Sequence, residues 1–594
     1  MKQTYEEIEE TYIKTLKGRA ALKRLLKDMA KNRKQTAVLI ASVMITAIAA
    51  TFSPLAIGDA VNGVADRSFK VILDFSLLFI GLAMIQFASN RFRVISSTIL
   101  AQGTVKNLRD RSFKSIQHVP ISFFSKVKAG FLISRMTNDG ETLGEFLTFQ
   151  IPSVVSGMTT VILSIAIMLY LDFNLTLYAL IVLPFLSMFT ISLQGKVRKN
   201  YLRTRRTIAA ITGNLAENIS SIRSIKAFNV ESYTEERFDG LNNDNLNANI
   251  RASRLSSMYG AIVRIIEYSG IAIVVLAGAI QLKAGLISIG ILVSFIFYVQ
   301  EFFDPVIQLS QLYNSYQSSI VGVGRIYGII DSKKEVQSEG EINISTLNDS
   351  IVLKDVNFAY DDSDALKNIN LTIKKGENIG IVGHTGAGKT TLSNLIMKFY
   401  TPQTGEILVD GRNLSEINTE SYRNLISPVL QEPFLFRGTI YENVKIAAPD
   451  KSEKEIEKLA SDFSLKRIFD KLPEGMETNV GELGRSLSEG QKQAIAILRA
   501  LCRDPQIIIM DEPTSNIDPY SEKFIFQSLE KFARERTLIL ITHRFSMISL
   551  VDKIIVLQDG KIVESGTFPE LREKKGIFSQ MYDILYGNRG ESIE

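Results

Sequence analysis

The residues best suited to chemistry begin with a glycine-rich loop. Residues 378–382 predict a strand, residues 391–399 predict a helix, and the loop between them reads Gly383, His384, Thr385, Gly386, Ala387, Gly388, Lys389 and Thr390. Glycines let backbone N–H groups close around phosphates, and a helix N-terminus favours their negative charge. We therefore expect this loop and the adjoining Thr391 to bind a nucleotide, with Lys389 on its β- and γ-phosphates and Thr390 on Mg²⁺. The strand and helix on either side disfavour the alternative of a plain glycine-rich turn.

Two carboxylates and a histidine follow two further apolar strands. Residues 506–510 lead to Asp511 and Glu512, and residues 537–542 lead to His543. A strand tip can present one carboxylate to a metal ion and the next to an attacking water. We expect Asp511 to bind Mg²⁺, Glu512 to be the catalytic base, and His543 to touch the γ-phosphate and orient Glu512 and the water. Taken alone, the acidic pair could cap a helix and the histidine could be structural.

Composition limits the kinds of protein that could carry these residues. The chain has 594 residues, 46% of them hydrophobic and 22% charged, which predicts more than one domain, part in a membrane and part in water. The net charge of +5 suits basic cytoplasmic loops better than nucleic-acid binding, so we expect no nucleic-acid partner. The single cysteine, Cys502, excludes intrachain disulfides and cysteine-rich metal sites.

Six apolar stretches are long enough, at 1.5 Å per residue, to cross a hydrocarbon core of about 30 Å. They are residues 36–57, 71–88, 151–171, 175–193, 262–282 and 286–303. The segments before the first stretch, between the second and third, and between the fourth and fifth are rich in Lys and Arg, which places them in the cytoplasm. The two long basic connectors keep helical spacing, so we expect helices that continue beyond the membrane. No signal peptide is visible, and both chain ends are expected in the cytoplasm.

The sequence therefore predicts a multidomain, multi-pass membrane protein. We expect an amphipathic segment over residues 1–34, an all-α six-helix transmembrane domain over 35–330, a linker over 331–349 and a nucleotide-binding domain over 350–594. Short β-rich runs alternate with helical patterns in the last part, which is typical of an α/β P-loop NTPase domain.

One further motif carries a family resemblance that extends over almost the whole chain. Leu487, Ser488, Glu489, Gly490 and Gln491, followed by a helical pattern over residues 492–503, resemble the LSGGQ signature of ATP-binding cassette (ABC) proteins. The resemblance implies that Tyr360 stacks on adenine, that Gln431 is the Q-loop glutamine that binds Mg²⁺ and takes part in catalysis, and that residues 515–518, with Asp518, form the D-loop. Alone, Tyr360 and Gln431 would pass for an ordinary strand tyrosine and a surface amide.

The membrane half also resembles ABC exporters of the half-transporter type, multidrug and lipid exporters among them. The residues that match their two cytoplasmic loops are Phe123, Phe124, Gly130, Arg135, Asp139, Glu217, Ile225, Lys226, Ala227, Phe228 and Glu231. Without the cassette, these loops would read as ordinary amphipathic surface helices. The resemblance implies coupling helices, a plasma or inner membrane location, and ATP-driven export of small-molecule or lipid substrates by alternating access.

In this family two cassettes pair head to tail, so that Ser488, Gly490 and Gln491 of one would cap the ATP held by Lys389 of the other. Glu489 stands where the family has glycine. It could weaken one ATP site and so point to a heterodimer, or it could simply suit the positive end of a helix. Because Lys389, Asp511, Glu512 and His543 are all present, we favour a homodimer.

The sequence says little about the transported substrate. Arg264, Glu267, Glu301 and Asp304 lie in or beside predicted spans, where charges cost about 2.5 to 3.5 kcal/mol on insertion scales, so they are candidates for a cavity that takes amphipathic cations. Interfacial placement or mutual pairing, such as Arg264 with Glu267, is the alternative. An ATP-gated channel or receptor and an importer on the same fold remain rival functions, whereas the six spans exclude a soluble chromosome-type ATPase.

Overall fold

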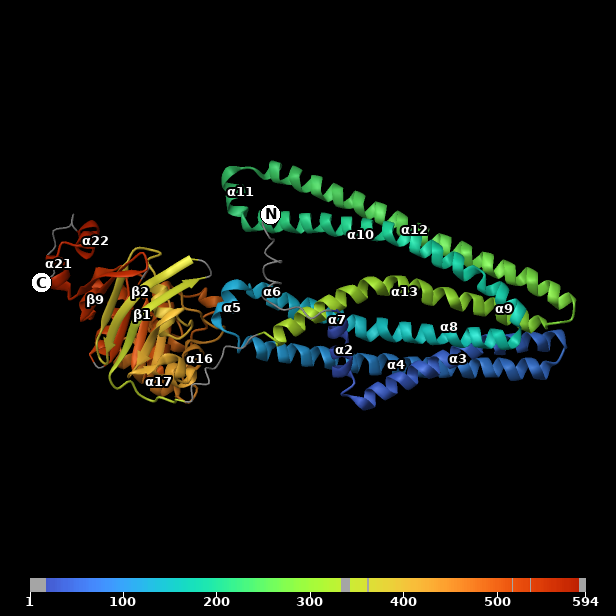
Figure 1. Cartoon of the computed structure of the whole chain (residues 1–594), viewed down its shortest axis with the longest axis horizontal. Helices are drawn as coiled ribbons and strands as arrows, with labels where there is room; N and C mark the ends of the chain where they lie inside the picture. Colours follow the sequence, from blue (N-terminus) through green and yellow to red (C-terminus); the bar gives the residue numbers. More distant parts are fainter. Residues whose placement is uncertain (1–17, 333–341, 361–362, 515–516, 535, 587–594) are drawn as a thin grey trace. The chain divides into compact units, whose positions relative to one another are not determined.

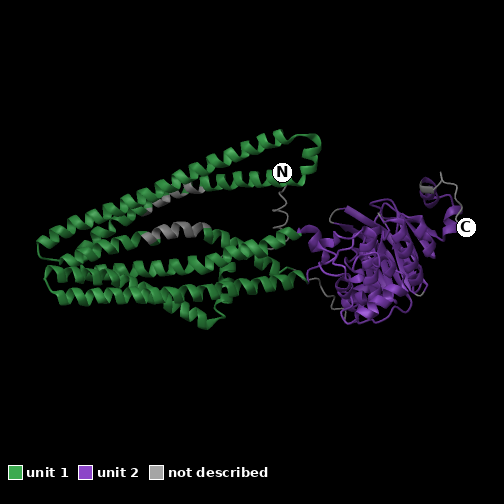
Figure 2. Ribbon diagram, turned by 180° about the vertical axis from the view of Figure 1, so that it is seen from behind, with its two compact units in different colours: residues 1–117, 129–332 green, residues 118–128, 333–594 purple. Residues whose placement is uncertain are grey.

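The computed structural model describes residues 18–332, 342–360, 363–514, 517–534 and 536–586. The chain divides into two compact units. Unit 1 comprises Met1–Gln117 and Ala129–Ser332, and unit 2 comprises His118–Lys128 and Lys333–Glu594 (Figure 2).

Unit 1 is helical, and several of its helices are very long (Figure 1). In chain order its elements are α2 (Gly18–Met29), α3 (Arg33–Ala65), α4 (Phe69–Ile116), α6 (Ala129–Ser134), the π-helical turn η1 (Arg135–Asp139), α7 (Gly140–Glu145), the π-helical turn η2 (Phe146–Gln150), α8 (Ile151–Leu171), α9 (Phe173–Leu180), α10 (Val182–Ser220), α11 (Ile222–Phe228), α12 (Glu231–Lys283) and α13 (Ile289–Ile330). Helices α4, α10 and α12 extend well beyond the apolar stretches, as the helical spacing of the basic connectors predicts.

The six apolar stretches lie in unit 1 and are helical over most of their length. By length and composition, the described residues contain four helical runs able to cross a membrane, Arg33–Ala65, Phe69–Ile116, Ala129–Leu171 and Glu231–Lys283, together with two shorter apolar stretches, Phe173–Leu186 and Ile289–Phe303. The predicted stretch over residues 175–193 is interrupted at Ile181, between α9 and α10. Pro184 explains the break, because a proline ring clashes with the carbonyl four residues earlier, here that of Leu180, where α9 ends.

Small residues bring α3 and α13 into close contact. A Cβ atom on Gly58 would collide with the Ser294 hydroxyl and the Gly290 carbonyl, so the two helix backbones approach more closely than larger residues would allow. The Ser294 hydroxyl donates to the carbonyl of Pro54 at 2.9 Å, and the side-chain oxygen of Asn62 accepts from the backbone N–H of Gly290 at 2.8 Å. The relative position of these two helices is therefore fixed by backbone contacts.

The N-terminal helix α2 is tied to α4 and to the end of α13 by a polar network. The Asp28 carboxylate pairs with Arg111 at 3.0 Å and accepts from the Tyr327 hydroxyl at 2.8 Å. Arg24 donates to Asp331 at 3.0 Å, and its guanidinium lies 4.2 Å from the centre of the Tyr327 ring. Behind this network, Ala21 and Leu25 are buried against unit 1.

Unit 2 contains two sheets. An antiparallel sheet has the order β2-β1-β4-β5, and a six-stranded sheet has the order β10-β9-β3-β8-β7-β6. The bounds are β1 (Ser350–Tyr360), β2 (Ser363–Lys374), β3 (Ile379–Gly383), β4 (Thr404–Val409), β5 (Arg412–Asn413), β6 (Ile426–Val429), β7 (Ile507–Asp511), β8 (Thr537–Ile541), β9 (Lys553–Gln558) and β10 (Lys561–Gly566). Neighbouring strands from β9 through β6 are parallel. The strand interiors are apolar runs buried on both faces, as a parallel sheet covered by helices requires.

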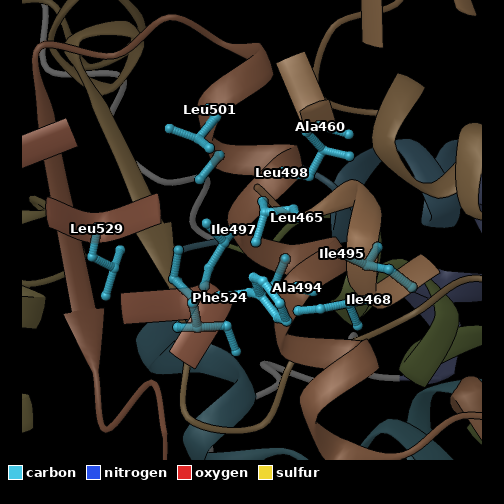
Figure 3. Close-up of a cluster of buried hydrophobic side chains, with 14 of the residues drawn as sticks. Ala460, Leu465, Ile468, Ala494, Ile495, Ile497, Leu498, Leu501, Phe524 and Leu529 are labelled. Atoms are coloured by element: carbon cyan, nitrogen blue, oxygen red, sulfur yellow. The ribbon is translucent and has the colours of Figure 1, made fainter. Parts of the chain in front are cut away.

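Unit 2 also contains α-helices and short 3-10 helices. They are α5 (Ile121–Lys126), α14 (Lys389–Ile396), η3 (Leu414–Glu416), α15 (Thr419–Leu425), α16 (Ile440–Lys445), α17 (Glu453–Asp462), α18 (Lys466–Phe469), η4 (Gly475–Glu477), η5 (Glu482–Gly484), α19 (Glu489–Cys502), α20 (Pro519–Ala533), η6 (Phe545–Leu550), α21 (Phe568–Glu573) and α22 (Ile577–Tyr586). Figure 3 shows the core around α19, where Ile495 and Leu498 pack among side chains of α17, α18 and α20. This packing fixes the position and direction of α19.

The segment predicted as a linker is only partly described. Residues 333–341 lie outside the described part, whereas residues 342–349 bond to unit 2: the backbone N–H of Leu347 donates to the side chain of Gln506 at 2.7 Å, and Leu347 itself is buried. At the other boundary, α5 belongs to unit 2, although the domain predicted over residues 35–330 includes it as part of a cytoplasmic loop.

Candidate nucleotide-binding site

The polar residues singled out in the sequence gather at one edge of the parallel sheet. The glycine-rich loop follows β3, His543 follows β8, Asp511 ends β7 with Glu512 directly after it, and Gln431 follows β6. Because these four strands are parallel neighbours in the order β3-β8-β7-β6, their carboxyl ends lie along the same edge. The sheet therefore assembles side chains that are more than a hundred residues apart in the chain.

The loop between β3 and α14 depends on its glycines. Gly386 and Gly388 have φ angles of +84° and +101°, a region that other residues rarely adopt. A Cβ on Gly388 would also lie 2.8 Å from the carbonyl oxygen of Ala365. His384, Thr385 and Gly386 are exposed, whereas Ala387 and Thr391 are buried. Backbone N–H groups of the exposed part can thus face a ligand while the rest anchors the loop.

Lys389 lies folded over this loop. Its Nζ donates to the carbonyl oxygens of Gly383 at 2.8 Å and His384 at 3.0 Å, and the side chain is only 7% exposed. Burial lowers the pKa of Lys389, and the nearby carboxylates of Glu512 and Asp511 act in the opposite direction. The ammonium group is thus held beside the loop and close to both acids.

Thr390 and Asp511 bring two oxygen atoms together. The Thr390 hydroxyl donates to Oδ2 of Asp511 at 2.9 Å. Burial raises the pKa of the Asp511 carboxyl, and the hydrogen bond from Thr390 offsets part of that rise. A hydroxyl oxygen beside a carboxylate oxygen suits a hard divalent cation, because such cations prefer oxygen ligands.

Glu512 is held by contacts from three neighbours. Its φ of +47° lies in the left-handed region, which costs about 1 to 3 kcal/mol for a non-glycine residue. Its backbone N–H donates to the carbonyl of Ile541 at 2.8 Å. Its carboxylate accepts from Nε2 of Gln431 at 3.2 Å and lies 3.1 Å from Nε2 of His543. The strained backbone aims this carboxylate at the site.

The surroundings of His543 favour the neutral form of its imidazole. Burial lowers the pKa of the imidazole, and the positive charge of Lys389 lowers it further. The neutral ring can then use Nε2–H as a donor to Glu512, so it orients the carboxylate without adding a charge.

Tyr360 lies at the end of β1 in a cluster of aromatic rings. It meets Phe358 edge to face at 4.9 Å and Tyr400 at 5.3 Å between ring centres, and it is 37% exposed. Sequence analysis missed Tyr400, which also hydrogen-bonds to Ser125 of α5 and has its pKa raised mainly by burial. Because Tyr400 is 40 residues from Tyr360 and belongs to no motif, the sequence offered no signal for it.

The LSGGQ-like residues form the start of α19. Ser488 caps the helix reciprocally with Gln491: the Ser488 N–H donates to the Gln491 side chain at 2.8 Å, and the Gln491 N–H donates to the Ser488 hydroxyl at 3.4 Å. Gly490 touches α20 so closely that a Cβ would lie 2.6 Å from that of Ser521. The Glu489 carboxylate pairs with Lys492 at 2.8 Å.

Asp518 caps the neighbouring helix α20. Its side chain accepts from the Ser521 N–H at 3.0 Å, and backbone hydrogen bonding lowers its pKa. In the described part of the chain, the side-chain hydrogen bonds of Ser488, Gln491 and Asp518 thus stay within their own helix ends. Ser515 and Asn516, the rest of the expected D-loop, lie outside the described residues.

The two segments expected to be coupling helices are short helices in different units. In α5 of unit 2, Phe123 and Phe124 meet edge to face at 5.6 Å. In unit 1, α11 joins the side-by-side helices α10 and α12 (Figure 1), and Lys226 pairs with Glu231 at 2.7 Å. Ile225 of α11 is buried, while Phe228 is 78% exposed.

Comparisons with known proteins agree with this geometry. The family model for the ABC transporter transmembrane region matches residues 36–306, and the model described as ABC transporter matches residues 366–515. A protein of Bacillus subtilis (strain 168), the uncharacterized ABC transporter ATP-binding protein YfiC, is 31% identical over 96% of this chain and 94% of its own length. The chain belongs to the ABC transporter family.

Other members of the family extend the likeness. The ATP-dependent lipid A-core flippase of Syntrophus aciditrophicus (strain SB) is 32% identical over 95% of this ABC transporter and 94% of its own length. A solved bacterial Atm1-family ABC exporter with ATP bound matches with a TM-score of 0.78 and 25% identity, over 94% of this chain and all of that one. This ABC transporter is therefore an ATP-hydrolysing membrane protein with the exporter fold, a fold that works as a dimer.

Proposed function

We propose that this chain is one half of an exporter in which ATP binding and hydrolysis at two head-to-tail cassettes move small or amphipathic substrates outward by alternating access. The supporting observation is that Glu512 meets both Gln431 and His543 at the strand edge that holds Lys389 and the Thr390–Asp511 pair. An acid, a neutral histidine and a phosphate loop at one edge suit phosphoryl transfer to water.

The roles follow from these contacts. Glu512 acts as the general base that takes a proton from the attacking water. His543 orients Glu512 through Nε2 and touches the γ-phosphate, and Gln431 holds the Glu512 carboxylate through its own Nε2. Lys389 leaves the carbonyls of Gly383 and His384 to meet the phosphates, and Tyr360 stacks on adenine.

The residues fit a magnesium ion. Thr390 Oγ1 and Asp511 Oδ2 are 2.9 Å apart, and Gln431, just after β6, could add its amide oxygen. Mg²⁺ takes one or two protein oxygens and completes its shell with waters and phosphate oxygens. When bound, it would neutralise charge that develops on the phosphates. The raised pKa of Asp511 supports this assignment, because a nearby cation would favour the ionised carboxylate.

The second cassette would complete each site. Ser488, Gly490 and Gln491 start a helix of 14 residues, and the positive N-terminal end of that helix suits the γ-phosphate held by Lys389 of the other copy. Asp518 would lie at the same junction. The Glu489–Lys492 pair neutralises the departure from the family signature, and we therefore propose a homodimer.

We further propose that the nucleotide-binding domain and both chain ends are cytoplasmic. The basic residues of α10, including Arg203, Arg205 and Arg206, lie beyond its apolar part, as the positive-inside rule requires of a cytoplasmic extension. The proposed domains are residues 35–330 in the membrane and 350–594 for the cassette, in a plasma or inner membrane.

The test is Mg²⁺-dependent ATPase activity of the chain, purified alone in lipid nanodiscs. We expect activity in the wild-type protein and a loss of roughly 10²- to 10⁴-fold in Glu512→Gln, with ATP still bound. The exposed Glu573→Gln serves as a matched control and should retain activity. Near wild-type turnover in Glu512→Gln would refute the catalytic assignment, and an idle but ATP-binding wild-type chain would refute the homodimer in favour of an unlike partner.

A further inference from the structure

Unit 1 contains a cavity of about 420 Å³ between α3, α12 and α13. Its lining includes Pro54 from α3, Arg264, Glu267 and Tyr268 from α12, and Phe297 and Glu301 from α13. Pockets that bind small molecules have volumes of about 300 to 1,000 Å³ and combine apolar walls with a few placed polar groups. The cavity has the size and the mixed lining of a ligand site.

Two of the three charged groups in this lining neutralise each other. Arg264 Nη1 lies 2.7 Å from Glu267 Oε2, one helical turn away on α12. The Glu267 side chain is only 3% exposed, so this carboxylate is committed to its pair with Arg264 rather than to the open cavity. Arg264 and Glu267 thus form the ion pair that the sequence left open as an alternative, and both also line the cavity, whereas the side chain of Asp304 lies outside the described residues.

Glu301 differs from this pair. Oε2 of Glu301 accepts from the Ser164 hydroxyl of α8 at 3.1 Å. Within the described part of the chain, no basic side chain forms an ion pair with Glu301. A carboxylate inside a membrane-spanning helix is costly, and such groups mark substrate or ion pathways by default. The lining therefore holds one acidic side chain that is paired with no basic side chain among the described residues.

The apolar part of the lining complements this charge. Tyr268 is 62% exposed and Phe297 is 37% exposed, so both rings are accessible from the cavity. Aromatic faces attract cations as well as apolar groups, and the attraction grows where water is excluded. An anion would instead meet the Glu301 carboxylate, with Arg264 already engaged by Glu267.

We propose that this cavity binds an amphipathic organic cation, with the positive group on the Glu301 carboxylate and the apolar body against Tyr268, Phe297 and Pro54. This inference rests on the proposed export function and names the chemical class of its cargo. Glu301 sets the charge preference, while Ser164 holds the carboxylate in place.

The experiment compares two probes of similar size that differ in charge, tetraphenylphosphonium and the neutral triphenylphosphine oxide. Binding to the full chain in nanodiscs, without nucleotide, is measured by equilibrium dialysis against empty nanodiscs. We expect the cation to bind the wild-type chain, and Glu301→Gln to weaken it about tenfold or more, the range for a hydrogen bond to a charged group. The neutral probe should bind both proteins equally.

Gln300→Ala is the matched control, because Gln300 lines the same cavity next to Glu301 and carries no charge. It should leave cation affinity within about twofold, and Glu301→Asp should restore part of the affinity lost in Glu301→Gln. Equal cation affinity in wild type and Glu301→Gln, or no cation binding by the wild type, would overturn the inference. Neither result would affect the ATPase test with Glu512→Gln, so the failure of this proposal and of the proposed function can be told apart.

Discussion

The nucleotide-binding edge of unit 2 and the cavity of unit 1 are assembled in different ways. At the edge, the loop that leads to Lys389 follows β3, Asp511 ends β7 and His543 follows β8, and backbone groups of the glycine-rich loop complete the site. In the cavity, Arg264 and Glu301 occupy interior positions of long helices and act through side chains alone.

This difference decides how each site tolerates change. Backbone geometry at the edge leaves little freedom, because the loop needs φ angles and close approaches that only glycine permits. A cavity lined by side chains on helix faces can change its chemistry without disturbing the helices that carry it. We therefore expect few substitutions to be tolerated at the nucleotide-binding edge of unit 2. Substitutions in the cavity of unit 1 should change which ligand is preferred without disturbing the fold.

Among the effects on nucleotide affinity and on stability, the largest is expected at Lys389. In Lys389→Ala, ATP affinity should fall roughly 10- to 100-fold, because an ammonium group that meets phosphate oxygens is lost. Binding of a fluorescent ATP analogue to the full chain measures the change. Lys375→Ala removes an exposed lysine of the same unit, and Gln300→Ala changes the cavity; both should bind the analogue like wild type. If Lys389→Ala and Gln300→Ala lost equal affinity for the ATP analogue, the nucleotide-binding edge and the cavity would not be separate sites.

A smaller effect is expected at Gly490, where α19 touches α20. A methyl group there would overlap Ser521, so Gly490→Ala should destabilise the start of α19 by about 1 to 3 kcal/mol. Amide hydrogen exchange of α19 measures this local loss. Gly213→Ala in α10 is the counterpart from unit 1, because its new methyl group meets nothing within 4 Å, and it should leave exchange in α10 unchanged or slower. Unchanged exchange of α19 in Gly490→Ala would contradict the steric argument.

The smallest effect concerns two aspartates of unit 2 whose ionised forms change the stability of the fold in opposite directions. Burial raises the pKa of Asp511, so its ionised form costs stability at pH 7, and that cost disappears as the pH falls through its folded pKa toward 3.8. The lowered pKa of Asp518 reflects stability that is present above pH 3.8 and is lost as the pH falls through its folded pKa. In magnesium-free buffer, Asp511→Asn should slightly stabilise unit 2 at pH 7, whereas Asp518→Ala should cost about 1 kcal/mol as a lost helix cap.

Urea unfolding of the nucleotide-free chain at pH 7 and pH 4.5, followed through hydrogen exchange in β7 and α20, measures both changes. The gain from Asp511→Asn should be smaller at the lower pH. Two losses of equal size at pH 7 would show that Asp511 is an ordinary structural carboxylate.

Much of unit 2 could be predicted from sequence because its chemistry is local. The strands before Gly383, Asp511 and His543 are short apolar runs that end at the functional residue, so position in the chain gives position in the sheet. The contacts of Glu512 with Gln431 and His543 required only that the strands be neighbours. The sequence motifs did not, however, predict the positive φ of Glu512 or the position of the Tyr400 ring beside Tyr360.

In unit 1, the sequence predicted the helices but not the contacts between distant helices. The apolar stretches predicted the helices, and one helical turn predicted the Arg264–Glu267 pair. The contact of Ser164 with Glu301 joins α8 to α13 over 137 residues, and no local pattern encodes it. Hydropathy also did not separate α5 from the helices on either side of it, because membership of unit 2 is a matter of tertiary contacts.

The network around Asp28 has a consequence for how the protein is made. Helix α2 leaves the ribosome before α4 and α13, and Arg111 follows Asp28 by 83 residues, Tyr327 follows it by 299, and Asp331 follows Arg24 by 307. A nascent chain cannot close this network until α13 has been synthesised and inserted. Until then Arg24 lacks Asp331 and Asp28 lacks the Tyr327 hydroxyl, so full closure of the network around α2 is a late event in biogenesis that distinguishes a complete membrane unit from an unfinished one.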